Sequence, residues 1–294
     1  MLRHLNDAPA HPRRVVVLGA AGFVGRAVLA RLARDGVPVL PLTKGEVDLL
    51  AADAVERLGD LLKPHDALVA AAARAPVKDA DMLTENMLIA RAMVLGMARA
   101  SCQPLSHVVN ISSDAIYADS AAPLTEASSA APDSLHGAMH LARELMLRSA
   151  VAAPIAMLRP TLIYGSGDPH NGYGPNRFRR GAARGEDIEL FGEGEERRDH
   201  VHIADVAELV VQVLYRRSAG SLNIATGKVH TFRDIAQRVI SLSGSSSAIV
   251  SRPRSGPMPH QGYRAFDIAV CRTAFPDFRY TPLEEGLNRS QGAD

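Results

Sequence analysis

The segment Val15–Arg26 constrains the fold more than any other part of the chain. Four consecutive apolar residues run into a turn with glycines at Gly19, Gly22 and Gly25, and apolar residues then recur at a helical spacing. This order predicts a buried strand, a tight turn and a helix. The spacing G-x-x-G-x-x-G leaves the N–H groups at the helix start free to bind phosphates. An ordinary turn without a ligand is the alternative.

Strand and helix patterns continue to alternate after this segment. Further strands are expected at 37–42, 67–72, 107–112 and 155–159, and helices at 53–62, 83–100 and 135–150. The alternation predicts an α/β protein, a Rossmann-type doubly wound parallel sheet with ligands at the strand carboxyl ends. Shorter patterns in the second half predict a smaller C-terminal substrate lobe, with helices at 176–184, 205–217 and 232–243 and strands at 200–203 and 222–225.

The composition at the boundaries of these patterns gives a domain division. Residues 1–12 are polar and contain two prolines, which predicts a flexible tail. We expect the dinucleotide-binding domain to comprise 13–165 and 198–226. The substrate-binding lobe is then expected to comprise 166–197 and 227–294.

Bulk properties exclude several classes of protein. The formal net charge of +1 gives no global field for nucleic acid or membranes, and no apolar run is long enough to span a bilayer. The amino terminus lacks the apolar segment of a signal peptide. Cys102 and Cys271 have no metal-ligand spacing and suit a reducing compartment. We therefore expect a cytoplasmic protein with a small-molecule substrate and without nucleic-acid or membrane partners.

Several short motifs follow the glycine turn in a fixed order. They are Asp48-Leu49, Ala71-Ala72-Ala73, Asn86, Ser112-Ser113-Asp114-Ala115-Ile116-Tyr117, residues 158–165, residues 198–205, residues 222–227 and residues 282–287. Together they resemble the extended short-chain dehydrogenases/reductases of the NAD-dependent epimerase/dehydratase family, over roughly residues 13–287. Residues 44–80 are most similar to the dTDP-4-dehydrorhamnose reductase branch.

This resemblance implies an NAD(P) cofactor, a nucleotide-sugar-like substrate and a homodimer formed through the helices 83–100 and 135–150. Asp48 would bind the adenine, and Ala71 and Ala73 would line the cofactor. The full set implied to contact the dinucleotide is Gly19, Ala21, Gly22, Phe23, Val24, Lys44, Asp48, Leu49, Ala71, Ala73, Asn86, Ser112, His140 and Pro160. Asp48 as a helix cap remains an alternative.

The resemblance also implies substrate contacts. Ser113 would polarise the substrate carbonyl, and Arg198 would bind a substrate phosphate, as would Arg254. Each has a simpler alternative. Ser112 and Ser113 could merely end a strand, because serine is common in turns. Arg198 could be a solvated surface charge.

The chain departs from the family at its catalytic signature, Tyr-x-x-x-Lys. His136 stands at the tyrosine position and His140 at the lysine position. Residues four apart share one helix face, so both imidazoles are expected to point the same way. In the first interpretation His136 replaces tyrosine as the general acid/base, because an imidazole titrates near ~6.5, and His140 binds ribose or tunes His136.

Two other interpretations remain open for this histidine pair. The fold could have lost redox chemistry and serve as an NAD(P)-binding regulator or scaffold. The pair could also supply two of the ligands of a metal ion. Tyr117, Tyr164, His170 and Tyr173 are the remaining acid/base candidates.

The end of the second strand bears on cofactor preference. A carboxylate there usually binds the ribose 2′-OH of NAD, whereas a basic residue accommodates the 2′-phosphate of NADP. Here Thr43 and Lys44 precede Glu46. This order leans towards NADP, with Lys44 as a plain surface charge as the alternative. The sequence thus predicts an NAD(P)-dependent oxidoreductase, epimerase or dehydratase with an atypical active site.

Overall fold

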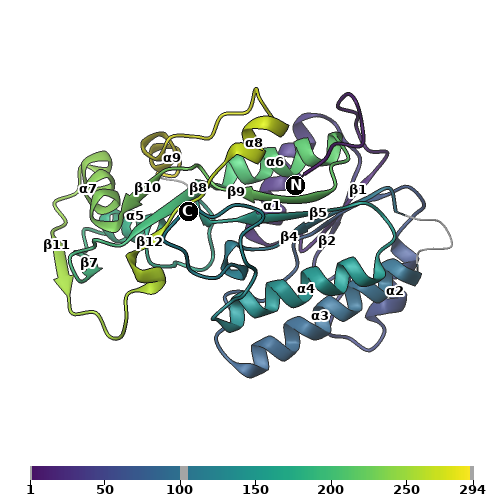
Figure 1. The fold of residues 1–294 in the computed structure, drawn as a ribbon, viewed down its shortest axis with the longest axis horizontal. Coiled ribbons are helices and arrows are strands. Elements are labelled where there is room, and N and C mark those ends of the chain that lie inside the picture. Colours follow the sequence, from purple (N-terminus) through teal and green to yellow (C-terminus); the bar gives the residue numbers. More distant parts are fainter. Residues whose placement is uncertain (1, 100–104, 292–294) are drawn as a thin grey trace. The chain divides into compact units, whose positions relative to one another are not determined.

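The structure is a computed structural model that describes residues 2–99 and 105–291 (Figure 1). The chain forms two compact units. Unit 1 comprises Met1–Ala118, Glu126–Pro160 and Ala207–Asn223, and unit 2 comprises Asp119–Thr125, Thr161–Val206 and Ile224–Asp294. Ala100 and Cys102, named in the sequence analysis, lie outside the described residues.

Unit 1 is built on a six-stranded sheet with the strand order β2-β1-β3-β4-β5-β9. The neighbouring pairs from β2 to β5 are all parallel. The inner strands β1, β3 and β4 are buried along their whole length, which explains their continuous apolar sequences. The strands are β1 (Val15–Leu18), β2 (Val39–Leu42), β3 (Ala67–Ala70), β4 (His107–Ile111), β5 (Ile155–Pro160) and β9 (Gly220–Ile224).

Helices cover both faces of this sheet. In Figure 1, α2, α3 and α4 lie together against one face, and α1 and α6 lie against the other. The predicted doubly wound fold class is therefore confirmed. The helices are α1 (Phe23–Arg34), α2 (Ala54–Leu61), α3 (Ala80–Arg99), α4 (Leu135–Ala150) and α6 (Ile203–Tyr215), with a 3-10 helix η2 (Asp114–Ile116) after β4.

Unit 2 contains two small sheets and its own apolar core. Its core packs aromatic side chains, among them Tyr164, Phe178 and Phe232, against aliphatic residues. The first sheet contains β6 (Leu162–Tyr164), β8 (Arg197–His202), β10 (Val229–Thr231) and β12 (Tyr263–Arg264), and the second pairs β7 (Ile188–Phe191) with β11 (Ile249–Arg252). The helices are α5 (Pro175–Ala183), α7 (Phe232–Ser243), α8 (Ala269–Ala274), α9 (Leu283–Arg289) and the 3-10 helix η3 (Pro259–Gly262).

Two features differ from the sequence-based expectations. Ile203 was expected to end a strand. Instead, β8 runs from Arg197 to His202, and Ile203 is the first residue of α6. Residues 3–10, expected to be a flexible tail, donate and accept backbone hydrogen bonds with residues 215–219. These bonds satisfy carbonyl groups at the carboxyl end of α6, which a helix leaves unpaired.

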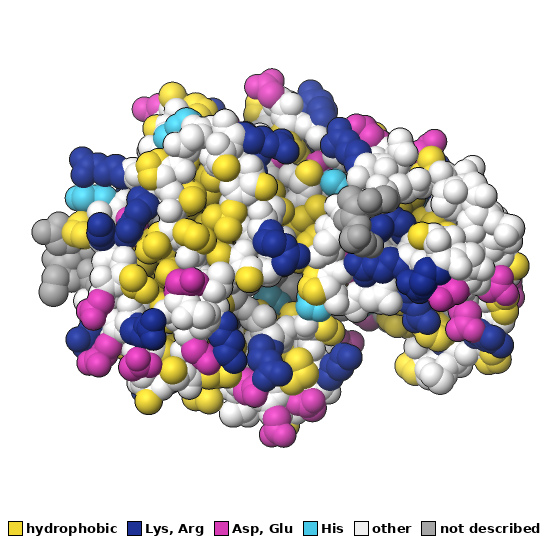
Figure 2. All heavy atoms as spheres, turned by 180° about the vertical axis from the view of Figure 1, so that it is seen from behind, with side chains coloured by type: hydrophobic (Ala, Val, Ile, Leu, Met, Phe, Trp, Pro, Cys, Tyr) yellow, Lys and Arg dark blue, Asp and Glu magenta, His cyan; other side chains and the backbone are white. Residues whose placement is uncertain are grey.

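The surface carries both signs of charge. On the face drawn in Figure 2, Lys and Arg side chains are interspersed with Asp and Glu side chains, in keeping with the net charge of +1. No helix within the described residues is long and apolar enough to cross a membrane.

Candidate functional site

The glycine turn between β1 and α1 leaves no room for a side chain at Gly19 or Gly25. Gly19 has a positive φ of +88°, and a Cβ there would lie 2.6 Å from the backbone nitrogen of Ala72. A Cβ on Gly25 would overlap the carbonyl oxygen of Gly19, and one on Gly22 would lie 3.1 Å from the same oxygen. The three glycines thus let the turn, the first helix and the loop after β3 approach one another closely.

A cavity of about 210 Å³ opens beside this turn at the carboxyl ends of β1 and β3. It brings together eight of the residues predicted to contact the dinucleotide, which are Gly19, Ala21, Gly22, Lys44, Asp48, Leu49, Ala71 and Ala73. The other six residues of the predicted set do not line the cavity in the part of the chain that the structure describes. They are Phe23, Val24, Asn86, Ser112, His140 and Pro160. The lining is mostly apolar, as expected for the walls of a cleft that takes an aromatic base.

Asp48 does not cap the helix that follows it. Its Oδ1 accepts from the backbone N–H of Leu50 at 3.1 Å, and Asp53 holds the N-cap position of α2. Its Oδ2 lies 3.4 Å from Nζ of Lys44, whose side chain is largely exposed. Both side chains line the cavity, so a carboxylate and an ammonium group are available at its rim.

Asn86 lies on α3 and positions the loop after β3. Its Oδ1 accepts from the backbone N–H of Arg74 at 2.9 Å, and its Nδ2 donates to the carbonyl oxygen of Arg74 at 2.9 Å and to that of Met82 at 2.8 Å. Asn86 is 2% exposed. Because this loop carries Ala71–Ala73, Asn86 shapes the cavity wall without lining it.

Ser112 and Ser113 follow β4 directly. Ser113 is the N-cap of η2, and its Oγ accepts from the backbone N–H of Ala115 at 3.1 Å. The Oγ of Ser112 is buried without a hydrogen-bond partner in the part of the chain that the structure describes. Ser113 therefore has the turn role expected of a strand-ending serine, while the hydroxyl of Ser112 is unused.

His136 and His140 pack edge to face at the start of α4, with ring centroids 4.7 Å apart and an interplanar angle of 89°. The Nδ1 of His136 accepts from the backbone N–H of Val77 at 3.5 Å. A Cβ on Gly137 would overlap the carbonyl oxygen of Ala115, so glycine lets α4 begin directly against η2. This contact brings the histidine pair close to the segment that carries Ser113.

His140 is held in its neutral form. It is 6% exposed, and burial, together with His136 and Arg143, lowers the pKa of its imidazole well below the ordinary value. Its Nδ1 has no hydrogen-bond partner among the described residues. At neutral pH His140 thus carries no positive charge, unlike the lysine that the family places at this position.

Arg143 lies one turn further along α4 and was missed by the sequence reasoning. Its guanidinium donates to Oδ1 of Asn110 at 2.7 Å and to backbone carbonyls at the ends of β3 and β4: Ala70 at 2.6 Å, Ala72 at 2.9 Å and Ile111 at 3.0 Å. It forms no ion pair with a carboxylate of the described residues. Burial lowers its pKa to about 10, which leaves it cationic at neutral pH.

A signal for the burial of Arg143 was present in the sequence. It lies four residues from both Met139 and Leu147, and all three side chains are buried on one face of α4. An arginine between two apolar residues at helical spacing indicates a buried cation that needs internal acceptors.

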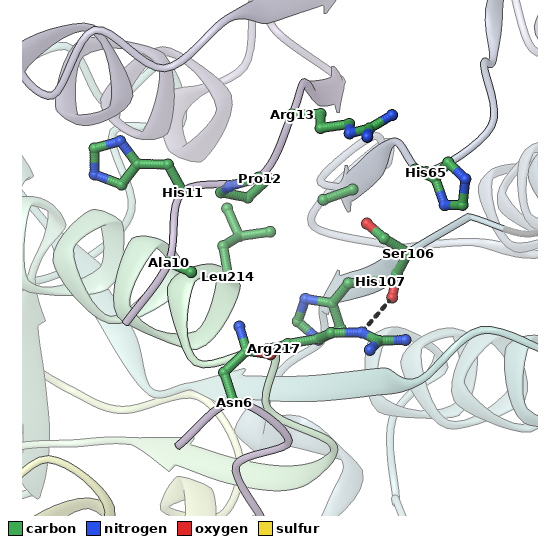
Figure 3. Close-up of a pocket in the computed structure, with 11 residues that line it drawn as sticks. Asn6, Ala10, His11, Pro12, Arg13, His65, Ser106, His107, Leu214 and Arg217 are labelled. Carbon is green, nitrogen blue, oxygen red and sulfur yellow. Dashed lines mark hydrogen bonds between the residues drawn. The ribbon is translucent and has the colours of Figure 1, made fainter. Parts of the chain in front are cut away.

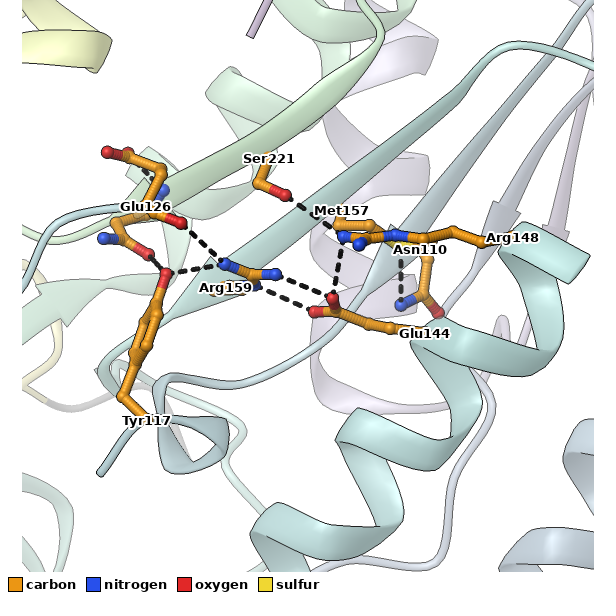
Figure 4. Close-up of polar contacts among 9 residues, drawn as sticks. Asn110, Tyr117, Glu126, Glu144, Arg148, Met157, Arg159 and Ser221 are labelled. Atoms are coloured by element: carbon orange, nitrogen blue, oxygen red, sulfur yellow. Dashed lines mark hydrogen bonds and ion pairs between the residues drawn. The ribbon is translucent and has the colours of Figure 1, made fainter. Parts of the chain in front are cut away.

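The next residue, Glu144, belongs to a separate polar network (Figure 4). Arg159 on β5 donates to its two carboxylate oxygens at 2.9 and 2.8 Å, and Arg148 donates to it at 3.2 Å. Arg159 also donates to the hydroxyl of Tyr117 at 2.7 Å, and that hydroxyl donates to Oδ1 of Asn223 at 2.7 Å. Burial raises the pKa of Tyr117, and the side chains of Tyr117, Glu144 and Arg159 are buried and hydrogen-bonded to one another, as expected of a structural network.

Two of the remaining acid/base candidates on unit 2, Tyr164 and Tyr173, are engaged elsewhere, and His170 is exposed. Tyr173 packs on Phe178, Phe191 and Phe232, and its hydroxyl accepts from the backbone N–H of Phe191 at 3.1 Å. The hydroxyl of Tyr164 donates to the carbonyl oxygen of Leu283 at 3.4 Å. No group of three or more His, Cys, Asp or Glu side chains within residues 2–99 and 105–291 could hold a metal ion.

The two arginines implied to bind substrate meet in unit 2. The Nη1 of Arg198 donates to Oε1 of Glu196 at 3.1 Å, and the Nη1 of Arg254 lies 3.5 Å from Oε2 of the same carboxylate. Arg198 is 9% exposed, so it is not a solvated surface charge. Its Nε is buried without a partner among the described residues. Two guanidinium groups thus share one carboxylate, which leaves a local excess of positive charge.

Comparison with known families decides the classification. The model of the NAD dependent epimerase/dehydratase family matches residues 15–225. The chain belongs to this family. The chain therefore falls in a family of enzymes, as the sequence motifs predict.

Individual relatives agree with this membership. The chain is 28% identical over 288 residues to a dTDP-6-deoxy-L-talose 4-dehydrogenase (NAD(P)(+)) of Kitasatospora kifunensis, with 89% of each chain covered. A GDP-L-fucose synthetase from Naegleria fowleri bound to NADP superimposes with a TM-score of 0.81 at 16% identity, covering 98% of this chain and 95% of the other. A UDP-glucose 4-epimerase of Thermus thermophilus in complex with NAD gives 0.81 at 24% identity, covering 94% and 97%.

Proposed function

We propose that the protein is an NAD(P)-dependent enzyme that oxidises, reduces or epimerises a carbon of a nucleotide-linked sugar. The observation that carries this proposal is the coincidence of the glycine turn with the cavity at the carboxyl ends of β1 and β3, lined by eight residues predicted for the cofactor. The names of its relatives, which refer to nucleotide-linked sugars, support the substrate class.

The residues present fit a dinucleotide. Side chains at Gly19 and Gly25 would fill the space between the turn and its neighbours, and Asp48 lies at the cavity rim to accept from an adenine amino group. A nicotinamide dinucleotide bound there would supply the hydride donor or acceptor. The residues of the chain would hold the phosphates at the start of α1 and enclose the base between apolar walls.

We assign the proton-transfer role to His136. Because its Nδ1 accepts from the N–H of Val77, the neutral ring carries its proton on Nε2. The proton donor in the reduction of a carbonyl is the imidazolium form, which gives the Nε2 proton to the substrate oxygen and becomes the neutral ring. In the reverse direction the neutral ring takes up a proton and returns to the imidazolium. Ser113 would donate a hydrogen bond to the same oxygen.

Arg143 would supply the positive charge that His140 lacks. Its guanidinium is buried one turn from His140, and none of the carboxylates in the described residues neutralises it by an ion pair. Because its guanidinium donates only to neutral oxygens, its positive charge acts on nearby titratable groups, among them His140. We infer that Arg143 lowers the proton affinity of His140, as the lysine of the family lowers that of the tyrosine.

Arg198 and Arg254 are proposed to bind the diphosphate of the substrate. They share the single carboxylate of Glu196, so the cluster is left with a net positive charge. Arginine suits this role, because its planar fork matches two phosphate oxygens.

The cofactor preference is proposed to lean to NADP. The carboxylate of Glu46, the acidic group after β2, already accepts from the backbone N–H of Thr43 at 2.8 Å and from its hydroxyl. The hydrogen bonds to Thr43 hold the carboxylate of Glu46 within the turn. Lys44 is exposed at the cavity rim and can approach a 2′-phosphate.

We also propose a homodimer formed through α3 and α4. These helices pack side by side on one face of the sheet, and they carry large apolar side chains on their outer surface. The exposed leucines are Leu88 and Leu95 on α3 and Leu135 and Leu145 on α4. Sedimentation that finds only monomer at micromolar concentration would contradict this proposal.

The first experiment is a calorimetric titration of nucleotide-free protein with NADP⁺ and with NAD⁺. We expect binding, with NADP⁺ the tighter ligand, and its loss in Gly25→Ala, whose methyl would overlap the turn. Gly172→Ala is the matched control, because Gly172, like Gly25, has no positive φ, but its Cβ would meet no atom within 4 Å. The absence of binding by folded wild-type protein would favour the alternative, a scaffold or regulator without turnover.

The proton role is tested with His136→Ala in a turnover assay with nucleotide-linked 4-keto sugars. We expect kcat to fall by about 10²- to 10⁴-fold, the usual contribution of a general acid/base. The variant should also lose the near-neutral limb of its pH profile. Unchanged activity with an unchanged profile would remove His136 from the mechanism. Dinucleotide binding without any turnover in the wild type would support the regulator.

A further inference from the structure

A second cavity, of about 250 Å³, lies in unit 1 at the opposite edge of the sheet from the glycine turn (Figure 3). Its walls include Ala67 and His107, the first residues of β3 and β4, and Arg13, which comes just before β1. Because the strands are parallel, this amino edge is separated from the carboxyl edge by the length of the strands. The remaining walls come from residues 6–12 and from the end of α6.

The ionisable side chains that line this cavity are all basic. Those of the described lining residues are Arg13, Arg217, His11, His65 and His107, and none of the described lining residues is acidic. The adjacent Arg14 is paired bidentately with Asp66, at 2.9 and 2.5 Å. Arg13 itself makes no ion pair or side-chain hydrogen bond with the described residues. Arg217 donates from Nε to the carbonyl oxygen of Ser106 at 2.8 Å and likewise forms no ion pair there.

The negative end of α6 is already covered at this cavity. The carbonyl oxygen of Tyr215 accepts from the N–H of Ala10 and from Nδ2 of Asn6, and that of Arg216 accepts from the N–H groups of Leu5 and Asn6. The amino-terminal segment thus neutralises the acceptors that would repel an anion. The permanently charged side chains that line the cavity are then those of Arg13 and Arg217.

His107 determines which hydrogen-bonding group a ligand of this cavity must provide. It is 1% exposed, and its Nε2 lies 2.7 Å from the carbonyl oxygen of Ser218, so Nε2 carries the ring proton. Its Nδ1 is then an acceptor, and it is buried without a partner among the described residues. Burial lowers the pKa of the imidazole to about 4, which keeps Nδ1 unprotonated at neutral pH. A matching ligand therefore has to donate a hydrogen bond.

The backbone of the cavity wall is strained at two positions. His65 has a φ of 67° and Arg217 a φ of 47°, both in the left-handed region that side chains other than glycine rarely adopt. At Arg217 this conformation closes α6, because its N–H and that of Ser218 donate to the carbonyl oxygens of Leu214 and Val213. Both basic residues line the cavity.

We propose that this cavity binds a small oxyanion that carries a hydroxyl group, with the chemistry of hydrogen phosphate. Arg13 and Arg217 pair with the anionic oxygens, and Nδ1 of His107 accepts from the P–O–H group. The anion links the segment before β1 to the end of α6. The site is separate from the proposed cofactor site and does not depend on it.

The proposal is tested by calorimetric titration of the full chain with inorganic phosphate and, separately, with inorganic sulfate. Sulfate has the same shape but carries no proton at neutral pH, so it cannot donate to His107. We expect one phosphate per chain, bound at least about tenfold more tightly than sulfate, since an unpaired buried acceptor is costly. Equal affinities for the two anions would overturn the proposal.

Variants locate the binding. Arg13→Gln and Arg217→Gln are each expected to weaken phosphate binding by about tenfold or more, as removal of a charge-assisted pair does. Arg3→Gln is the matched control, because Arg3 lies in the same segment but does not line the cavity, and it should leave binding unchanged. Arg13 is exposed and uncommitted, so its variant should fold normally even if Arg217→Gln does not. Phosphate binding that is insensitive to Arg13→Gln would place the anion elsewhere, for example at the glycine turn, and would overturn the proposal.

Discussion

Two neighbouring residues of α4, Arg143 and Glu144, carry buried charges with different partners. The carboxylate of Glu144 forms ion pairs, whereas the guanidinium of Arg143 forms none with the described residues. Around Glu144 the buried carboxylate is paired with Arg148 and Arg159, and the nearby carboxylate of Glu126 accepts from the backbone N–H of Asn223. Only Nδ2 of Asn223 lacks a hydrogen-bond partner among the described residues. Around Arg143 the cation meets only neutral oxygens, and Nδ1 of His140 and Oγ of Ser112 have no partner there.

Whether the buried polar groups have partners helps to distinguish a region that stabilises the fold from one that binds a ligand. A region selected for stability alone satisfies its buried polar groups, because each unpaired one costs free energy. Unsatisfied groups and an unneutralised cation are expected where a ligand completes them. The carboxyl edge of β3 and β4 has that character, and the Glu144 network does not.

The network of Glu144, Arg148, Arg159 and Tyr117 is called the closed network below. The largest expected effect on stability comes from breaking it. Glu144→Ala leaves Arg159 buried without its carboxylate, so we expect a loss of about 3–5 kcal/mol in the free energy of unfolding. Urea denaturation measures this loss. The double variant Glu144→Leu/Arg159→Met removes both charges and should recover much of it. A single variant as stable as the wild type would mean that the network is not the closed structural unit described above.

Removal of one hydroxyl from the same network has the next largest effect. Tyr117→Phe deletes the group that bridges Arg159 and Asn223, so we expect a loss of about 1–3 kcal/mol in unfolding free energy. Dinucleotide affinity, measured by calorimetry, should stay unchanged. A large loss of affinity with little loss of stability would instead group Tyr117 with Arg143, His140 and Ser112, which we call the open region.

The open region should respond to pH. In the folded chain the pKa of His140 is well below 6.5, and on unfolding it returns to about 6.5, so the unfolded state binds the proton more tightly. The stability linked to neutral His140 is thus fully present above about pH 6.5 and falls by up to about 1.4 kcal/mol for each pH unit below it. Urea denaturation at several pH values measures this slope.

His140→Gln is the control for that slope. Burial also lowers the pKa values of His107, His200 and His202, so the wild type and the variant will both lose stability in acid. The difference between the two slopes isolates His140. Parallel curves would show that His140 is protonated equally in both states.

The smallest effect is expected at the exposed rim of the closed network. The side chain of Arg148 is 50% exposed and adds a second, longer contact to Glu144. Arg148→Ala should therefore cost less than about 1 kcal/mol, as for other solvent-exposed ion pairs. A cost similar to that of Glu144→Ala would mean that Arg148, and not Arg159, neutralises the carboxylate.

Local sequence signals were sufficient for much of unit 1. The strand 15–18 and the helix 135–150 have the predicted boundaries, because apolar periodicity and an adjacent glycine turn or N-cap specify each of them locally. Much of unit 2 was not predicted. Strands β7 and β11 are short and pair in parallel across about 60 residues of chain, so neither has a local signature.

The candidate site divides in the same way. The glycines and the residues of the cavity wall were identified because their motifs are contiguous in sequence. Arg143 was missed because an arginine on a helix usually indicates a solvated surface. Its burial depends on carbonyl groups from two strands, Ala70 and Ala72 on one side and Ile111 on the other, which only the folded sheet brings together.

The last strand of the six-stranded sheet has a consequence for how the protein is made. β9 lies beside β5 at the sheet edge, but it leaves the ribosome about 60 residues later, which takes about 3–12 s at ordinary rates of synthesis. Until then the edge of β5 is an unpaired row of N–H and C=O groups. A nascent chain stalled before residue 220 would therefore be the form most exposed to aggregation and most dependent on chaperones.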